Sequence, residues 1–94
     1  MKIGAIGVIE VNFCSNAVIV LDAMLKASDV KVESCYKTLG GRMVHIIISG
    51  STSQVDEAVN AAKQAEDSQL EQGSLKVAVT ISNPHSEILR FINN

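Results

Sequence analysis

The order in which strand-like and helix-like periods alternate along this chain is the feature that most restricts its fold. Four short runs rich in β-branched residues, at 3–11, 30–36, 43–49 and 75–82, are typical of strands. Between the first and second runs, and again between the third and fourth, apolar residues recur with the spacing of a helix. The pattern therefore predicts the order β-α-β-β-α-β.

The helices have recognisable ends. Ser15 can cap the start of the first helix, and Ser28 with Asp29 interrupts its end. The apolar face of this helix is predicted to consist of Ala17, Val20, Leu21, Met24 and Leu25. The second helix follows a polar break at 50–53, stops near Gly73, and is predicted to face the sheet with Val55, Ala58, Val59, Ala62 and Ala65.

The chain ends in a short segment that also reads as a helix. Pro84 suits its first position, and the sequence SEILRFI follows shortly afterwards. Ile88 and Phe91 are expected to dock on the body of the domain.

These elements predict an α+β fold class. We expect a ferredoxin-like βαββαβ four-stranded antiparallel sheet with two main helices on one face and a short C-terminal helix, because β-α-β crossovers are right-handed. The 94 residues are expected to form a single domain, 1–94, with its core at about 3–82 and a C-terminal tail at 83–94. The strands at 3–11 and 43–49 are apolar on both faces. We therefore predict that the final segment or neighbouring subunits cover the second face.

Composition argues against several classes of function. The net charge is −2, no run of Lys or Arg occurs, and aromatic residues make up 3%, so no nucleic-acid partner is expected. Glu10 interrupts the apolar N-terminal run, so neither secretion nor a membrane span is expected, and the predicted location is cytoplasmic. Cys14 and Cys35 lack CxxC spacing and are expected to be buried as small apolar residues.

The histidines and carboxylates that could take part in catalysis are not spaced along the sequence as they are in a catalytic motif. His45 lies inside an apolar run, where a structural role is expected, and His85 follows Pro84, where capping or an interface contact is the simplest role. A polar helix end is interpreted as a solvated face without a role: Glu66, Asp67 and Glu71. We predict no catalytic residue, no metal site, no cofactor and no enzyme activity.

The loop that contains Gly40, Gly41 and Arg42 joins the second and third strands. Paired glycines permit close backbone approach and expose N–H groups, and Arg42 adds a planar guanidinium group that is always positively charged. These residues are compatible both with an anion site and with an ordinary hairpin turn. No G-x-x-x-x-G-K-[ST] pattern is present, so nucleotide binding is not expected.

Four segments in order resemble the bacterial microcompartment (BMC) shell domain: AIGVIEV, LDAMLKASDV, the GGR loop before a strand ending in SG, and ISNPHSEI. The resemblance covers residues 5 to about 88. It implies the single-domain type of shell protein, whose cyclic homo-hexamers self-assemble into the shell of a bacterial microcompartment. The implied partners are other shell proteins, encapsulated enzymes and metabolites that cross the shell.

The resemblance also implies a pore. In the family, the loop between the second and third strands lines the central pore, and here it consists of Thr38, Leu39, Gly40, Gly41 and Arg42. A ring of backbone N–H groups with Arg42 nearby would favour small polar or anionic metabolites. The loop is about one residue longer than the commonest family version, so whether Arg42 points into the pore or back to a neighbour stays open.

The family's tile edge carries a lysine in the pattern D-A-M-x-K, which Lys26 matches. An arginine often precedes the Pro-His pair in the family, but Asn83 precedes Pro84 and His85 here, and Asp29 stands where a neutral Asn is common. Loss of the guanidinium weakens one edge contact. The chain could tile less readily alone, be a minor shell component, or use another edge geometry.

Other classes of function remain as alternatives. A small-molecule-sensing ferredoxin-like regulatory domain would form a dimer or trimer with saturable ligand binding at a subunit interface. A small enzyme would need a pocket built from His45, His85 or Cys35, for which no spacing exists. Some related shell proteins hold an iron–sulfur cluster through a loop cysteine, but Cys35 is expected to lie in the strand before the loop.

Overall fold

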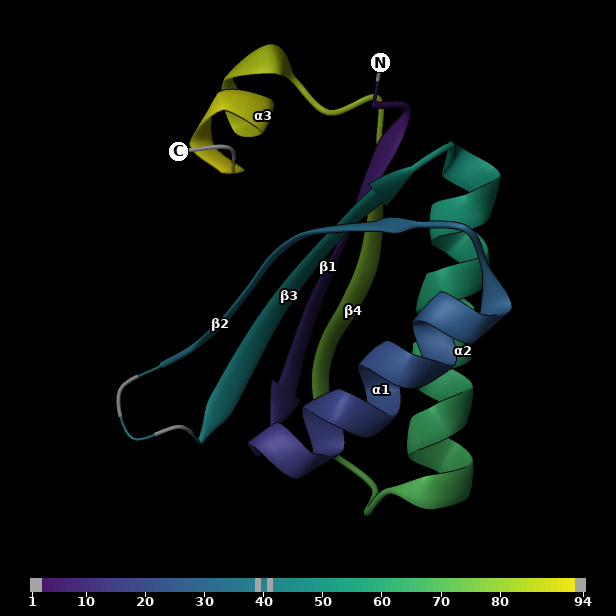
Figure 1. Cartoon of the computed structure of the whole chain (residues 1–94), viewed down its shortest axis with the longest axis vertical. Coiled ribbons are helices and arrows are strands. Elements are labelled where there is room, and N and C mark those ends of the chain that lie inside the picture. Colours follow the sequence, from purple (N-terminus) through teal and green to yellow (C-terminus); the bar gives the residue numbers. More distant parts are fainter. Residues whose placement is uncertain (1–2, 39, 41, 93–94) are drawn as a thin grey trace.

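The predicted order of elements is present in the computed structural model, which describes residues 3–38, 40 and 42–92. In chain order the elements are β1 (Ala5–Asn12), α1 (Cys14–Ala27), β2 (Lys31–Lys37), β3 (Met43–Gly50), α2 (Thr52–Gln69), β4 (Leu75–Ser82) and α3 (Ser86–Ile92). Figure 1 shows the four strands side by side, with α1 and α2 packed together beside them.

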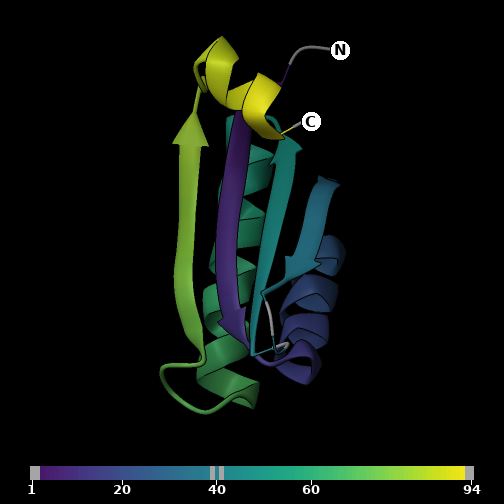
Figure 2. The same ribbon diagram turned by 90° about the vertical axis from the view of Figure 1, so that its left-hand side faces the viewer.

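The strands form one antiparallel sheet in the order β2-β3-β1-β4. The two edge strands are therefore β2 and β4. Figure 2 shows α1 and α2 on the same face of the sheet. This arrangement confirms the predicted α+β class, with a four-stranded antiparallel sheet and its two long helices in one layer.

The hydrophobic core lies between the sheet and the two long helices. Every second residue of β1 and β3 points toward the helices, and the resulting core contains Ala5, Ile9, Val11, Val44, Ile46 and Ile48 from the sheet and Ala17, Val20, Met24, Val55, Ala58, Val59 and Ala62 from the helices. Gly7 lies in the same row of β1. A Cβ at Gly7 would come within 2.7 Å of Cγ1 of Ile48 and 3.2 Å of Cγ1 of Val55. The missing side chain lets α2 approach β1 closely.

The start of α1 differs from the expectation. Its N-cap is Phe13, with φ 69° and no side-chain cap, so the prediction that Ser15 caps the helix is wrong. The backbone N–H of Phe13 donates to the carbonyl of Arg42 at 3.0 Å, which fixes the chain before the helix begins. Leu25, expected on the apolar face, is 45% exposed because it lies to one side of the buried Val20 and Met24.

Both ends of α2 are held by side chains. At the start, Ser51 and Gln54 form a capping box: the N–H of Gln54 donates to Oγ of Ser51 at 3.2 Å, and the N–H of Ser51 donates to Oε1 of Gln54 at 3.0 Å. Near the end, the carboxylate of Glu66 accepts hydrogen bonds from the N–H groups of Gly73 at 2.9 Å and Leu75 at 2.8 Å.

The interpretation of Glu66 as part of a solvated face is therefore wrong. This side chain is buried, whereas Asp67 and Glu71 are exposed. Glu66 lies four residues after the buried Ala62, on the stripe of α2 that faces the sheet.

The second face of the sheet, which we call the open face, is not covered by α1 or α2. The β4 residues Val77, Val79 and Ile81 lie on it together, and Val79 and Ile81 are 47% and 40% exposed. Neighbouring strands add more apolar side chains to this face, namely Ile6 and Val8 from β1 and Met43 and Ile47 from β3.

The final helix leaves most of the open face uncovered within one chain, although Ile6, at one end of this face, is buried. The expectation that Ile88 and Phe91 dock on the body is wrong: α3 has no buried residue, and Phe91 is 81% exposed. Asn83 adopts a left-handed backbone, with φ 49°, and its N–H donates to the carbonyl of Gly4 at 2.8 Å. This turn places α3 at the end of the sheet, on the side of the open face (Figures 1 and 2).

Candidate functional site

The predicted pore loop is the hairpin between β2 and β3. The N–H of Thr38 donates to the carbonyl of Met43 at 3.0 Å, which closes the hairpin. Gly40 has φ 89°, in the left-handed region that favours glycine, and among the described residues beyond its chain neighbours no heavy atom lies within 4 Å of the position that its Cβ would occupy. Leu39 and Gly41, two of the predicted pore residues, lie outside the described residues.

Arg42 stands at the base of this loop. Its carbonyl accepts the hydrogen bond from Phe13, so the loop is tied to the start of α1. Its side chain is exposed, and no ion pair among the described residues involves it. The hairpin therefore presents a positive charge to another molecule or to solvent.

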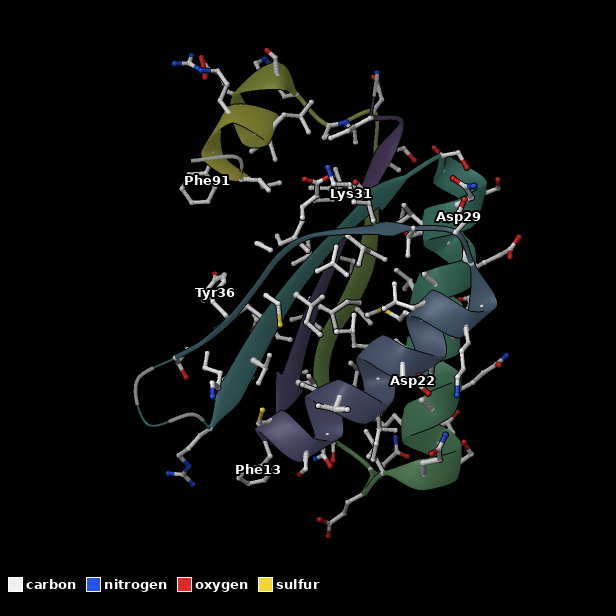
Figure 3. All side chains as sticks on the ribbon, in the orientation of Figure 1. Phe13, Asp22, Asp29, Lys31, Tyr36 and Phe91 are labelled. Carbon is white, nitrogen blue, oxygen red and sulfur yellow. The ribbon has the colours of Figure 1, made fainter. Side chains whose placement is uncertain are left out.

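The predicted edge residue Lys26 lies near the end of α1. Its Nζ is 2.9 Å from Oδ2 of Asp22, one helical turn earlier, and the two side chains are 76% and 58% exposed. An exposed pair of this kind contributes about 0.5 kcal/mol or less to stability. Asp29 is also exposed, just before β2. Figure 3 shows Asp22 and Asp29 on the helix side of the molecule.

The other predicted edge residues follow β4. Pro84 is buried, and His85 is exposed. Nδ1 of His85 accepts a hydrogen bond from the N–H of Glu87 at 3.1 Å, and its carbonyl accepts one from Ile88 at 2.9 Å. His85 therefore caps the start of α3, which agrees with the role expected from its position after a proline.

The candidate edge residues occupy two separate parts of one chain. Lys26 and Asp29 flank the end of α1, whereas Asn83, Pro84 and His85 join the end of β4 to α3. In Figure 3, α3 with Phe91 lies on the opposite side of the view from Asp29. None of the described hydrogen bonds or ion pairs connects the two groups. A single edge site would therefore need more than one chain.

A row of polar and aromatic side chains crosses the open face. His45 of β3 lies opposite Glu10 of β1 and opposite Tyr36 of β2. Nδ1 of His45 is 3.4 Å from Oε2 of Glu10, and the His45 ring stacks on the Tyr36 ring with centroids 4.8 Å apart. His45 and Glu10 side chains are only 20% and 35% exposed. Strand alternation could have placed each residue on this face, but the sequence pattern does not give the cross-strand register.

Both cysteines are exposed, contrary to the expectation that they are buried. Cys14 is the first residue of α1, and Cys35 lies in the edge strand β2, so neither is enclosed by the core. We call the shallow groove between these elements the α1–β2 groove; it is lined by Cys14, Ala17, Val18, Leu21, Cys35, Tyr36, Lys37, Val44 and Ile46. Cys35 precedes the loop, as expected.

The residues that the structure describes also bear on metal binding and on insertion into a membrane. No group of three or more His, Cys, Asp and Glu side chains there is arranged to hold a metal ion. None of the helices in this part of the chain is long and apolar enough to cross a membrane.

The fold and these surfaces define a small α+β domain that presents an apolar sheet face and an exposed glycine-containing hairpin to other molecules. The model of the BMC domain family matches residues 5–84, and the chain belongs to this family. This match confirms the family that the sequence segments indicated.

The related proteins that this chain matches differ in length. The carboxysome assembly protein CcmO of Synechococcus elongatus is 34% identical over 88 residues, which cover 94% of this chain and 30% of the relative. The bacterial microcompartment shell protein PduA of Salmonella typhimurium is 26% identical over 92 residues, which cover 98% of this chain and 94% of the relative. The chain thus spans about a third of the CcmO relatives and nearly all of PduA.

A solved structure has the same fold. The microcompartment protein from Desulfitobacterium hafniense superimposes with a TM-score of 0.79 at 26% sequence identity. The aligned region covers 98% of this chain and 48% of the solved chain. The likeness extends over all the elements that form the sheet and its helical layer.

Proposed function

We propose that this chain is a structural shell subunit of a bacterial microcompartment. The observation that carries this proposal is the BMC domain match over residues 5–84, supported by similarity along nearly all of a shell protein, PduA. The subunit acts by assembling and not as an enzyme. Its place is the microcompartment shell in the bacterial cytoplasm, where other shell proteins and enclosed enzymes are its partners.

The proposed assembly is a cyclic hexamer that tiles into a layer. A ring of identical chains uses a heterologous contact, which needs two different surfaces on each chain. The chain offers two such apolar surfaces: the open face, and the α1–β2 groove with its neighbour Phe13. Phe13 is 51% exposed and Val18 is 62% exposed, so this second surface also lacks a partner within one chain.

The proposed pore is formed where the β2–β3 hairpins meet on the axis of the ring. Arg42 is exposed and has no ion-pair partner among the described residues, so its charge is available to a solute. A ring of such charges, together with exposed backbone N–H groups, favours small anionic or polar metabolites over cations.

The proposed tile edge is completed by subunits that belong to two neighbouring tiles. Lys26 with Asp29 and the residues Asn83, Pro84 and His85 lie in separate parts of one chain. Contact between two tiles would bring the first group of one chain to the second group of another.

Solution mass tests the assembly. We expect light scattering of dilute protein to give about six times 10.0 kDa, and electron microscopy of concentrated protein to show sheets or tubes. Val79→Glu, on the open face, is expected to reduce the mass to that of a monomer because it places a charge in the contact. Lys76→Gln changes the net charge by the same amount on the same strand and is expected to keep the wild-type mass.

A different mass would contradict the proposed hexamer. A stable wild-type monomer would remove support for self-assembly. A dimer or trimer that binds a small molecule saturably would favour the regulatory-domain alternative.

Ion selectivity tests the pore. Arg42→Glu is expected to reverse an anion preference to a cation preference when hexamers are inserted in a lipid bilayer and their conductance is measured in asymmetric salt. Arg42→Gln removes the charge without reversing it and is expected to give an intermediate selectivity. Unchanged anion preference in Arg42→Glu, in a protein that keeps the wild-type mass, would show that Arg42 does not set the selectivity.

A further inference from the structure

A polar hollow opens at the end of the molecule where α1 begins and α2 ends. We call it the amide hollow. Its volume is about 380 Å³, within the range of sites that hold small molecules. Its walls include four amide side chains, an aromatic ring and a lysine, namely Asn12, Phe13, Asn16, Gln69, Gln72 and Lys76. Figure 3 shows Phe13 at the same end of the molecule as the last turn of α2. These residues all belong to one chain, so the hollow does not depend on the proposed assembly.

One wall of the amide hollow is the turn between α2 and β4, and hydrogen bonds hold this turn in place. The N–H of Asn12 donates to the carbonyl of Ser74 at 2.9 Å, which joins the end of β1 to the turn. The buried carboxylate of Glu66 accepts hydrogen bonds from the N–H groups of Gly73 and Leu75. The wall is therefore formed before any ligand binds, and binding to a preformed site loses less free energy to ordering.

The four amide side chains of the hollow are available to a ligand. Asn12 and Asn16 are half-buried, and Gln69 and Gln72 are exposed. None of the side-chain hydrogen bonds among the described residues involves any of these four amides. Each amide has an oxygen that accepts and an NH₂ group that donates. A hydroxyl group also both accepts and donates, so a small molecule with several hydroxyls matches these walls.

Phe13 provides the apolar part of the hollow. Its backbone has φ 69° and ψ 139°, a combination that glycine adopts readily and a bulky residue rarely does. Backbone strain of this kind is concentrated at ligand sites, where the strained residue has a task that another conformation would not serve. The ring is 51% exposed, so burial within this chain offsets little of the strain. Its face offers an apolar surface on which the C–H groups of a ligand can pack.

The charges at the hollow cancel. Within the described part of the chain, the charged side chains that line it are Glu71 and Lys76. None of the ion pairs among the described residues joins these two groups. One negative and one positive group leave the site without a net charge, so the walls favour neither an anion nor a cation.

We propose that the amide hollow binds the ring of a small uncharged sugar. The hydroxyl groups of the sugar pair with the amide side chains, and the C–H face of the ring packs on Phe13. A linear polyol has the hydroxyls without the flat C–H face, so the ring form fits better. The N–H of Phe13 donates to the carbonyl of Arg42 at 3.0 Å, so the bound sugar lies next to the hairpin of the proposed pore.

Saturation-transfer difference NMR tests this proposal with the neutral methyl glycosides of glucose, galactose, mannose and N-acetylglucosamine as probes. We expect at least one of them to bind the wild-type protein saturably, with the strongest transfer to the C–H protons of the ring. Asn16→Ala and Gln69→Ala are each expected to weaken this binding by about tenfold, because each removes hydrogen bonds to hydroxyls. Phe13→Gly, which also relieves the strained backbone, is expected to weaken it by at least as much.

Asn60→Ala is the matched control. Asn60 is an exposed amide of α2 that does not line the hollow, so this variant is expected to bind as the wild type does. Phe13 also borders the α1–β2 groove, so light scattering of Phe13→Gly is measured beside its binding per chain. Circular dichroism of each variant checks that it stays folded.

Charged and linear probes test the chemical class of the ligand. Glucuronate and glucosamine carry a negative and a positive charge on the same ring and are expected to bind more weakly than the neutral glycosides, because an ion loses hydration in a hollow without net charge. Sorbitol, which has no ring, is also expected to bind more weakly. Tighter binding of glucuronate would overturn the proposal in favour of an anion site, and equal binding of sorbitol would show that the ring is not recognised.

Two further results would overturn the inference. One is that none of the neutral glycosides binds the wild type saturably. The other is that Asn16→Ala and Phe13→Gly bind as the wild type does, which would place the sugar elsewhere on the molecule. Both results are distinguishable from failure of the proposed function, because the hollow is complete in one chain. A monomer that binds the sugar would support the hollow and contradict the hexamer, whereas a hexamer that does not bind it would do the reverse.

Discussion

Glu66 holds the connection between α2 and β4 through its two backbone hydrogen bonds, to Gly73 and Leu75. We predict that Glu66→Ala lowers the free energy of unfolding by about 1–3 kcal/mol, because the two N–H groups lose their acceptor and Leu75 is only half-exposed to water. Urea denaturation followed by circular dichroism measures this loss.

Asp67 is the matched control for this prediction. It is the next residue of α2, carries the same charge and is exposed. Asp67→Ala is expected to change the free energy of unfolding by about 0.5 kcal/mol or less. Equal losses in the two variants would show that the charge at this end of the helix matters, and not the hydrogen bonds of Glu66.

Single residues of the candidate site were predictable only where local chemistry decides their position. Asp29 and Arg42 are exposed because charged side chains are seldom buried without a partner. His85 caps α3 because it follows Pro84 in the turn that leads into this helix. Cys14 and Cys35 are exposed although cysteine is usually buried, because their burial depends on where α1 begins and on which strand lies at the edge. Those two facts are decided by contacts between distant parts of the chain.

At the scale of elements, the close approach of β1 and α2 depends on Gly7. We predict that Gly7→Ala lowers the free energy of unfolding by about 1–3 kcal/mol, because the new methyl group would lie 2.7 Å from the buried Cγ1 of Ile48 and would push β3 or α2 outward. The midpoint of thermal unfolding and urea denaturation both measure this effect.

Gly4 provides the control for Gly7. A Cβ there would have only ordinary contacts, at 3.4 Å from the nearest atoms, so Gly4→Ala is expected to be neutral or slightly stabilising. If both variants were equally stable, the packing of α2 on β1 would be looser than the distances indicate.

The order and type of the elements could be predicted, but their ends and docking could not. Periods of two and of 3.6 residues separate strands from helices wherever one face is buried. The left-handed backbone of Asn83, with φ 49°, turns α3 away from the sheet. The helical pattern of SEILRFI predicts the helix but not the backbone conformation of Asn83, which decides where the helix lies. Likewise, the backbone hydrogen bond from Phe13 to Arg42 replaces the side-chain cap expected at Ser15, because it joins residues that are far apart in the sequence.

At the scale of the whole molecule, the proposed assembly would bring the two groups of edge residues together only between tiles, so a change in one group should alter tiling without altering the proposed hexamer. We predict that Asn83→Arg lowers the protein concentration at which sheets form by about tenfold, because a guanidinium can add one or more charge-assisted hydrogen bonds across the edge. The left-handed backbone at this position costs an arginine about 1 kcal/mol of stability, which a folded domain can tolerate. Turbidity and electron microscopy over a dilution series measure the onset of sheets, and light scattering checks the hexamer.

Asn83→Lys and Asn83→Gln separate the causes of this effect. Lysine supplies the charge without the planar fork and is expected to lower the onset concentration less than arginine does, whereas glutamine is expected to leave it unchanged. An equal effect of arginine and lysine would mean that net charge alone controls tiling. If neither Asn83→Arg nor Asn83→Lys changed the onset concentration, the tile edge would lie elsewhere on the molecule. The separation of Lys26 from the 83–85 segment in the single chain would then have no role in assembly.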